Sequence, residues 1–243
     1  MNGCLSAEGV KMKILDIYNL FKTLFKSVYS NTKYIKNSAM ITVFFIFLTV
    51  IPIGIWKVYD FIDFELRVIL WTFYYVVFVW AFVENYRKKY SLTLADIGLN
   101  KNISLKKSLL LGIGASIFTV VLAILAAKFL PLSEYKSPLS FLFEHSKGGL
   151  KGQFVIAFMI IPFVVSEEII FRGLIYGYLK KHKSFTFALL ISSFLFAAMH
   201  GSPLVMLIVF IYGVIWVYLY EKTGGIIAPI IAHYLHNIIS IYL

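Results

Sequence analysis

One apolar stretch of the chain reads Phe154-Val-Ile-Ala-Phe-Met-Ile-Ile-Pro-Phe-Val-Val-Ser-Glu167-Glu168-Ile-Ile-Phe-Arg172-Gly-Leu-Ile-Tyr176. An ionisable group at membrane depth costs about 2.5–3.5 kcal/mol or more, so such groups are rare there and are usually paired or functional. Here Glu167, Glu168 and Arg172 lie within six positions of one apolar stretch. The search for function therefore starts from these three side chains.

The composition around this stretch indicates an all-α, polytopic membrane protein. The 243 residues are 60% hydrophobic and only 14% charged, whereas a soluble domain carries roughly 25% charged residues. The apolar residues form blocks of about 17 to 25 residues, which is the length a helix needs to cross the hydrocarbon core. The single cysteine, Cys4, forms no internal disulfide. About seven spans are predicted, together with an N-terminal amphipathic helix. The predicted spans cover residues 38–56, 66–83, 108–130, 154–179, 185–201, 203–220 and 226–242.

The basic residues predict the orientation of these spans. The net charge is +11, and lysines and arginines gather in the N-terminal segment and in the connections after the second, fourth and sixth spans. Such connections face the cytoplasm, so the N-terminus is predicted inside and the C-terminus outside. With the basic residues assigned to these connections, no basic surface is left for nucleic acid, and none is expected to bind. The abundance of Lys, Ile, Phe and Asn is typical of a low-GC bacterium, which predicts a multi-pass protein of a bacterial plasma membrane.

The chain divides into two predicted parts. Residues 1–36 form a cytoplasmic segment, in which residues 13–30 have apolar positions at helical spacing with lysines between them. This pattern predicts an amphipathic helix on the inner membrane surface, or a helix packed on the bundle. Residues 37–243 form the transmembrane domain, with its catalytic core at about 150–243, because the polar intramembrane residues crowd into the last four spans.

Helical geometry separates the two glutamates. At about 100° per residue, Arg172 lies on the same face as Glu168 and can neutralise it, whereas Glu167 points elsewhere. Two later spans add titratable groups: His200 ends the fifth, and His233 and Asn237 share one face of the seventh, with His236 about 60° away. Each histidine taken alone is typical of a hydrogen-bonded core residue. Together they predict a site at membrane depth.

Two chemistries fit this set of side chains. A glutamate with a histidine can deprotonate water, while an asparagine and a second histidine donate hydrogen bonds to the oxyanion of an attacked amide. Alternatively, two histidines and a glutamate match a catalytic zinc shell with an open position. Both arrangements hydrolyse peptide bonds, and helical spacing does not choose between them.

These residues also resemble a known family. Glu167-Glu168-Ile-Ile-Phe-Arg172 resembles the EExxxR motif, Phe196-Ala-Ala-Met-His200 resembles FxxxH, and His233-Tyr-Leu-His-Asn237 resembles HxxxN. In order and spacing they are similar to the CAAX protease and bacteriocin-processing (CPBP) family of intramembrane proteases, also called Abi or type II CAAX prenyl endopeptidases. The resemblance covers residues 90–243, including Leu94-Ala-Asp-Ile-Gly-Leu99. Three motifs in order on separate spans make it specific.

The resemblance implies a role for each motif residue. Glu167 and His200 are expected to activate the attacking water, His233 and Asn237 to stabilise the oxyanion, and Glu168 and Arg172 to support the site. A metal-free mechanism without a cofactor is favoured. If zinc is used instead, its expected ligands are Glu167, His200 and His233.

The leading hypothesis is an intramembrane endopeptidase that cuts a membrane-anchored or hydrophobic peptide in the lipid bilayer. In a bacterium, processing of a pheromone or bacteriocin leader is more plausible than cleavage of a prenylated protein. Alternative hypotheses are a non-catalytic membrane scaffold or bacteriocin self-immunity protein, and an ion or proton transporter. The sequence lacks the paired broken helices typical of transporters, which disfavours the last.

Overall fold

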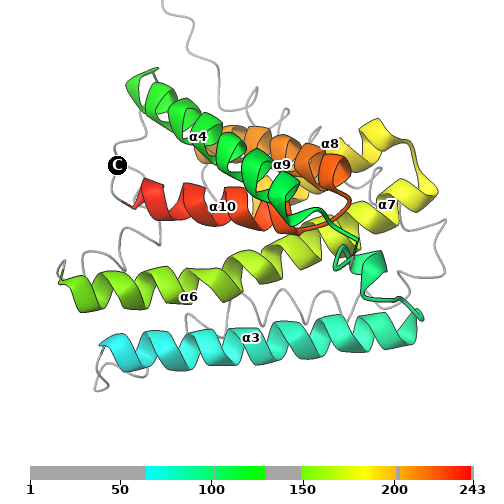
Figure 1. Cartoon of the computed structure of the whole chain (residues 1–243), viewed down its shortest axis with the longest axis horizontal. Coiled ribbons are helices and arrows are strands. Elements are labelled where there is room, and N and C mark those ends of the chain that lie inside the picture. The colour runs from blue at the N-terminus through cyan, green and yellow to red at the C-terminus, as the bar shows by residue number, and fades with distance from the viewer. Residues whose placement is uncertain (1–63, 101, 130–148, 201–202, 242–243) are drawn as a thin grey trace, which may run out of the picture. The chain divides into compact units, whose positions relative to one another are not determined.

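The computed structural model describes residues 64–100, 102–129, 149–200 and 203–241, all of them within one compact unit, Val58–Leu243. The described residues form helices and no strand, so the all-α prediction is confirmed (Figure 1). The predicted helix over residues 13–30, the boundary at residue 36 and the span over 38–56 lie outside the described residues. The helices are α3 (Phe64–Lys89), η1 (Ala95–Ile97), α4 (Leu105–Phe129), α6 (Leu150–Glu168), η3 (Ile169–Tyr176), α7 (Gly177–His182), α8 (Phe185–Ala198), α9 (Pro203–Thr223) and α10 (Ile227–Ser240).

Helix lengths support a membrane protein and correct the predicted spans in part. Three helical runs among the described residues are long and apolar enough to cross a bilayer. They are α4 (Leu105–Phe129), the continuous run Gly152–His182 that α6, η3 and α7 form, and α9 (Pro203–Thr223). By contrast, α8 and α10 have 14 residues each. At 1.5 Å per residue they reach only about 21 Å of a hydrocarbon core about 30 Å thick. They are therefore shorter than the spans predicted at 185–201 and 226–242, and the total of seven spans stays a prediction.

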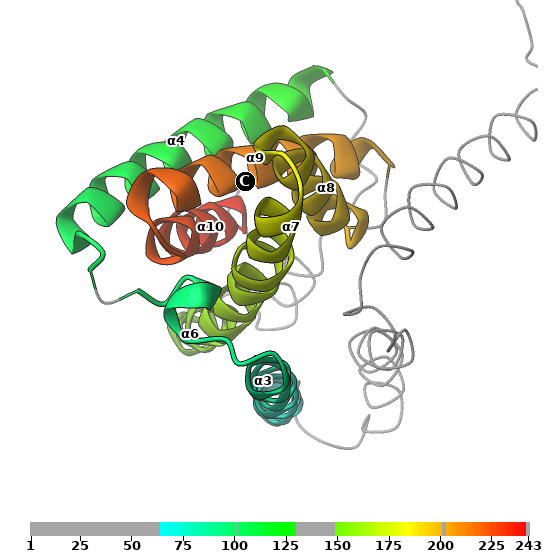
Figure 2. The ribbon, with the colours of Figure 1, turned by 90° about the vertical axis from the view of Figure 1, so that its right-hand side faces the viewer.

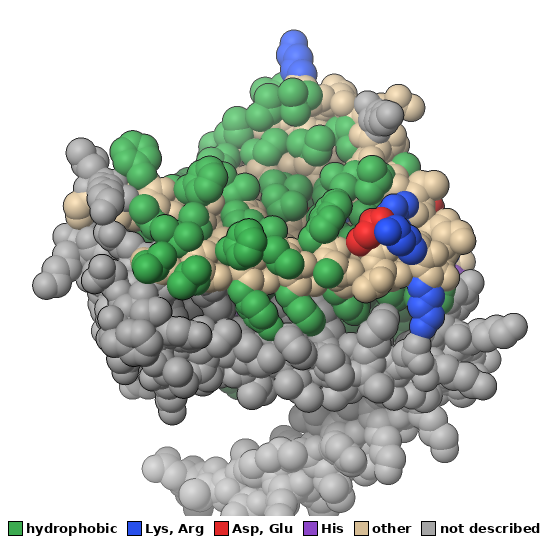
Figure 3. Space-filling model, turned by 90° about the horizontal axis from the view of Figure 1, so that it is seen from below, with side chains coloured by type: hydrophobic (Ala, Val, Ile, Leu, Met, Phe, Trp, Pro, Cys, Tyr) green, Lys and Arg blue, Asp and Glu red, His purple; other side chains and the backbone are tan. Residues whose placement is uncertain are grey.

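The outward face of α3 is apolar, as expected for a helix against lipid. Its exposed side chains recur every three or four residues, which places them on one stripe of the helix. Figure 3 shows hydrophobic side chains covering the described part of this face, with most of the charged ones gathered at one end. The stripe consists of Leu66, Ile69, Leu70, Phe73, Val77 and Trp80.

Helix α10 lies among the other helices and packs against α4, α9 and α6 (Figures 1 and 2). Small residues permit the close approach of α4 to α10 and of α9 to α8. A Cβ added to Gly112 of α4 would lie 2.9 Å from the carbonyl oxygen of Ala228, and one added to Gly213 of α9 would lie 3.0 Å from Ser193 of α8. On the α6 side, Ile156, Ile160 and Val164 form a buried apolar cluster against α10. Side chains of α10 can therefore meet side chains of several helices.

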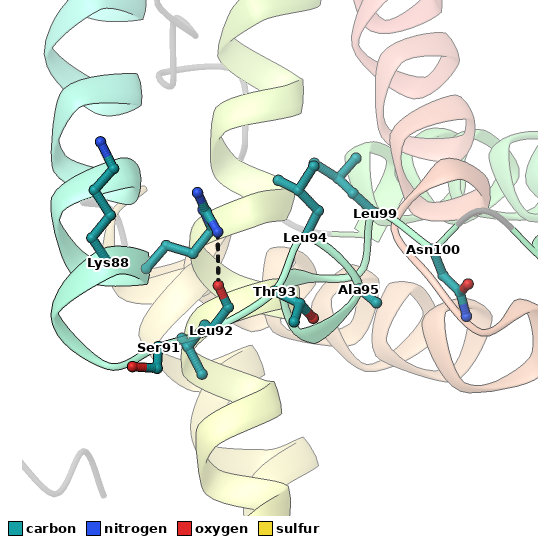
Figure 4. A pocket seen from close by; sticks show the side chains of 9 residues that line it. Lys88, Ser91, Leu92, Thr93, Leu94, Ala95, Leu99 and Asn100 are labelled. Atoms are coloured by element: carbon teal, nitrogen blue, oxygen red, sulfur yellow. Dashed lines mark hydrogen bonds between the residues drawn. The ribbon is translucent and has the colours of Figure 1, made fainter.

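The connections after α3, α7 and α9 meet at one end of the bundle. Lys181 binds Asp96 at 2.9 Å, and Lys180 binds Glu221 at 2.6 Å. An open cleft of about 650 Å³ lies beside the first of these connections, lined by residues of Arg87–Leu99 and by Asn100. There the Arg87 guanidinium donates to the Leu92 carbonyl oxygen at 2.9 Å (Figure 4). The sequence predicted these connections to share one side of the membrane, and their meeting agrees with that. Which side they face stays a prediction.

Asp96 makes this end of the bundle sensitive to pH. Hydrogen bonds from Thr93 and Lys181 hold the pKa of the Asp96 carboxyl well below its usual range. A carboxyl whose folded-state pKa is lowered adds stability above its unfolded pKa of about 3.9, and that stability is lost as pH falls further.

We therefore expect Asp96→Asn to destabilise the protein at pH 7, by about 1 kcal/mol or less because the pair is partly exposed. Below about pH 4 the difference between variant and wild type should shrink. Thermal unfolding of both proteins at the two pH values measures this. If the stability of Asp96→Asn and wild type differed equally at both pH values, the charge of Asp96 would not be the cause of the destabilisation.

Candidate active site

The two glutamates lie where the helix changes its winding. Helix α6 runs to Glu168 and continues without a break into the π-helix η3 and then into α7. The sequence prediction of one regular α-helix over 154–179 is wrong in this detail. Short π-helical segments are rare and occur frequently at functional sites.

Gly173 fixes the position of the π-helix against the connection that follows α3. A Cβ at Gly173 would lie 2.5 Å from the carbonyl oxygen of Ile97, whereas a Cβ at Gly177 would lie 3.6 Å from the nearest atom, the Asp96 carbonyl oxygen. The first distance requires backbone to move, and the second is an ordinary contact. The connection is held from its other side as well, since the Ile226 N–H donates to the Gly98 carbonyl oxygen at 3.1 Å.

We expect Gly173→Ala to lower the free energy of unfolding by about 1–3 kcal/mol, as overpacking does in a filled core. Gly177→Ala is the matched control, and its higher helix propensity should leave stability unchanged or raise it by about 0.5–1 kcal/mol. Unfolding of both variants in detergent compares them. Equal stability of the two would contradict the close contact at Gly173.

The predicted pair of Glu168 and Arg172 is confirmed. Arg172 Nη1 lies 3.0 Å from Glu168 Oε1, and their side chains are 1% and 0% exposed. The guanidinium also lies 4.5 Å from the ring centre of Phe196 and 5.2 Å from that of Trp216. Both distances are within cation–π range. A long hydrogen bond of 3.5 Å from Nη2 reaches the carbonyl oxygen of Gly213.

His233 lies between the two glutamates. Its Nδ1 is 2.8 Å from Glu168 Oε1, and its Nε2 is 3.6 Å from Glu167 Oε2. Because Glu168 Oε1 already accepts from Arg172, we assign the proton to Nδ1 of His233, which donates to the same oxygen. Nε2 is then the ring nitrogen that faces Glu167. It accepts a hydrogen bond when the ring is neutral and donates one when the ring is charged.

The two glutamates differ in their exposure. The side chain of Glu167 is 32% exposed, while that of Glu168 is 0% exposed. Glu168 is held by Arg172 and His233, whereas Glu167 is reachable from outside the protein core. This difference follows from their adjacent positions on the helix, because successive side chains point about 100° apart.

His200 lies in the turn after α8, not on the helix as predicted. The sequence continues Gly201-Ser-Pro203, and glycine and proline commonly follow the end of a helix. His200 Nδ1 lies 3.1 Å from the Phe196 carbonyl oxygen. A carbonyl only accepts, so Nδ1 carries the proton and Nε2 is the nitrogen able to accept one.

Phe196 joins the two histidines. Its ring centre is 5.1 Å from that of His200 and 5.7 Å from that of His233. The structure thus brings Glu167 directly to His233, and brings His200 to the same group through an aromatic side chain. Asn237 is half-buried one helical turn after His233. No hydrogen bond among the described residues joins its side chain to the other motif residues.

The predicted alternative zinc set does not form a ligand shell here. Among the described residues, no three His, Cys, Asp or Glu side chains are grouped so that they could hold a metal ion. Glu167, His200 and His233 as arranged therefore do not fit a zinc ion, because a tetrahedral site needs all three donors to converge.

One residue near the site, Trp216, was missed in the sequence, and the contacts of His236 were not predicted. Trp216 stacks on His233 with ring centres 4.1 Å apart and an interplanar angle of 22°. His236, whose ring centre lies 6.2 Å from that of Trp216, has its Nδ1 3.0 Å from Thr119 Oγ1 of α4. The sequence of α9 gave no signal that singled out Trp216, because a tryptophan in an apolar helix is common.

Comparisons with known proteins agree with the motifs. Residues 149–239 match the profile of the family described as Rce1-like, type II CAAX prenyl endopeptidase. The chain is 40% identical over 73 residues to the protein named "Putative membrane peptidase YdiL" of Bacillus subtilis (strain 168), a match that covers 30% of each chain. No solved structure matches. All seven motif residues lie within the matched range.

Proposed function

We propose that this chain, whose residues 149–239 match the profile of the Rce1-like type II CAAX prenyl endopeptidase family, hydrolyses a peptide bond of a membrane-associated peptide or protein with Glu167 as the base. The observation that carries the proposal is the different surroundings of two adjacent glutamates. Glu168 is fully buried and paired, while Glu167 is 32% exposed and faces His233. A base must reach water, and of the two only Glu167 is exposed.

In the proposed reaction Glu167 takes a proton from water, and the water oxygen attacks the carbonyl carbon of the peptide bond. His200, whose Nδ1 is engaged by a backbone carbonyl, presents Nε2 to assist this transfer. The carbon–nitrogen bond then breaks, and the leaving amine takes up the proton. No step requires a group that the chain itself does not supply.

His233 and Asn237 are the proposed donors to the oxyanion. With Nδ1 of His233 donating to Glu168 at 2.8 Å, a charged His233 presents its Nε2–H toward the side of Glu167, where the reaction takes place. Asn237, one turn further on α10, adds an amide donor. Donors held in place before the reaction stabilise charge that develops in the transition state. Glu168 and Arg172 support this arrangement.

Substrate class and location complete the proposal. A site among apolar helices suits a membrane-anchored or hydrophobic peptide in the lipid bilayer, such as a pheromone or bacteriocin leader. The charge pattern supports a multi-pass protein of a bacterial plasma membrane with the N-terminus in the cytoplasm.

The test compares the membrane and secreted peptides of cells that express the wild type or Glu167→Gln at equal levels. Mass spectrometry should find cleaved peptides that depend on Glu167. Full function of the variant would favour a scaffold or immunity protein. Flux of ions into proteoliposomes that depends on Glu167, without cleavage of any peptide, would favour a transporter.

Metal dependence has a separate test. We expect active, purified protein to retain activity in a chelator, because the donors do not converge on a metal position. Stoichiometric zinc in elemental analysis, combined with loss of activity in the chelator, would overturn the metal-free mechanism.

A further inference from the structure

The plane of the His233 ring sets its contacts with both glutamates. Its two nitrogens face carboxylates of two different glutamates, at 2.8 Å and 3.6 Å, so the ring plane decides both contacts. The outer torsion of a histidine side chain is broad and has no sharp rotamer minima. Something other than torsional preference must therefore hold the ring in this plane.

Trp216 of α9 provides a flat wall against that ring. The indole and imidazole lie nearly parallel, at 22°, with centres 4.1 Å apart, which is the geometry of a stacked pair. Phe196 meets the same imidazole almost perpendicularly, at 88° and 5.7 Å. A rotation of the His233 ring would press it into one of these two aromatic side chains.

The indole is itself firmly held and contacts the other half of the site. Trp216 is 1% exposed. Its neighbours Tyr212 and His236 have ring centres 6.1 Å and 6.2 Å away, and the Arg172 guanidinium lies 5.2 Å from its centre. One side chain therefore borders both His233 and the cation that neutralises Glu168.

We propose that Trp216 is a positioning residue, which holds the His233 ring so that Nδ1 meets Glu168 and Nε2 faces Glu167. This inference rests on the proposed function for its effect on catalysis, but not for its effect on the ring. The competing explanation is that Trp216 only fills volume in the core. That explanation predicts loss of stability on substitution, with no change in the orientation of His233.

Side-chain ¹⁵N and ¹³C spectra of protein labelled at histidine separate the two explanations. The chain has only five histidines, so His233→Gln suffices to assign the His233 signals. In the wild type we expect a protonated Nδ1 and ring protons shifted upfield by the indole. Trp216→Phe keeps a ring to stack on and should retain the Nδ1 signature. Trp216→Leu should lose the upfield shift because the indole is gone, and should lose the Nδ1 signature through exchange between tautomers.

The same variants carry a kinetic expectation, measured on the peptides found to depend on Glu167. Trp216→Leu should reduce kcat on the order of 10²-fold, since small misplacements of catalytic groups cost about this much, with little change in KM. Trp216→Phe should keep most of the wild-type kcat, because phenylalanine still provides a ring that stacks on His233. Trp80→Leu on α3, where the tryptophan is 52% exposed, is the matched control and should leave spectra and kcat unchanged.

Two results would overturn the inference. One is a protonated-Nδ1 signature of His233 that persists in folded Trp216→Leu. The other, which does not depend on the folding of Trp216→Leu, is a wild-type spectrum in which the His233 ring protons show no upfield shift. If the spectra behave as expected but no peptide is cleaved by the wild type, the positioning of His233 stands and the proposed function fails.

Discussion

Glu167→Gln in purified protein is expected to lower kcat about 10²–10⁴-fold, which is the contribution of a general base, while leaving the thermal stability close to that of the wild type. The amide keeps the shape of the side chain but takes no proton from water. Because the side chain is 32% exposed and its contact with His233 Nε2 is long, at 3.6 Å, little folding energy depends on its charge. Hydrolysis of a cleaved peptide and thermal unfolding of the same preparation measure both effects.

The neighbouring substitution, Glu168→Gln, is the matched control. It makes the same chemical change one residue away, but at a side chain that is 0% exposed and accepts from Arg172 and His233. Breaking a buried pair costs about 3–5 kcal/mol, so this variant should unfold at a lower temperature. If Glu168→Gln stayed stable and inactive while Glu167→Gln kept its turnover, the roles assigned to the two glutamates would be reversed.

Helical periodicity was sufficient to predict that Glu168 pairs with Arg172 and that Glu167 points elsewhere. The pairing of Glu168 with Arg172 depends only on positions four residues apart, and local spacing survives the change of winding after Glu168. The helices of the described residues were also predictable, because apolar blocks and basic connections repeat along the chain. The ends of α8 and α10 were not predictable, because apolar residues continue in the sequence past the last residue of each helix.

Contacts between helices account for what the sequence did not reveal. The stack of Trp216 on His233 joins α9 to α10, and the contact of Gly173 with Ile97 joins the π-helix to a distant connection. Such pairs leave no periodic signal in a single sequence, because each partner is an ordinary residue for its own helix. The π-helix was missed for the same reason: its eight residues are apolar or small apart from Arg172, as in a regular membrane helix.

Arg172→Met should destabilise the protein by about 3–5 kcal/mol, the cost of leaving one partner of a buried ion pair uncompensated. The side chain is 1% exposed, and among the described residues its guanidinium is the only full positive charge in contact with Glu168 when His233 is neutral. Methionine fills part of the space between Phe196 and Trp216, so the loss reports mainly on charge. Unfolding in detergent by heat or denaturant measures it.

Arg87→Met on α3 is the control for this change. Arg87 also pairs with a glutamate on its own helix, Glu84 at 2.8 Å, but both side chains are more than a quarter exposed. Exposed pairs contribute little, so Arg87→Met should unfold close to the wild-type temperature.

The double variant Glu168→Gln/Arg172→Met decides whether the cost comes from the stranded charge. Removing both charges of a buried pair is often nearly neutral, whereas removing one is not. We therefore expect the double variant to be more stable than Arg172→Met alone, by a few kcal/mol. If the double variant lost as much stability as the two single variants together, the pair would not be coupled. Arg172 would then act through its aromatic contacts instead. Restored stability without restored hydrolysis would show that the charges of this pair are needed for the reaction beyond their part in folding, because Glu168 is also what orients His233 Nδ1.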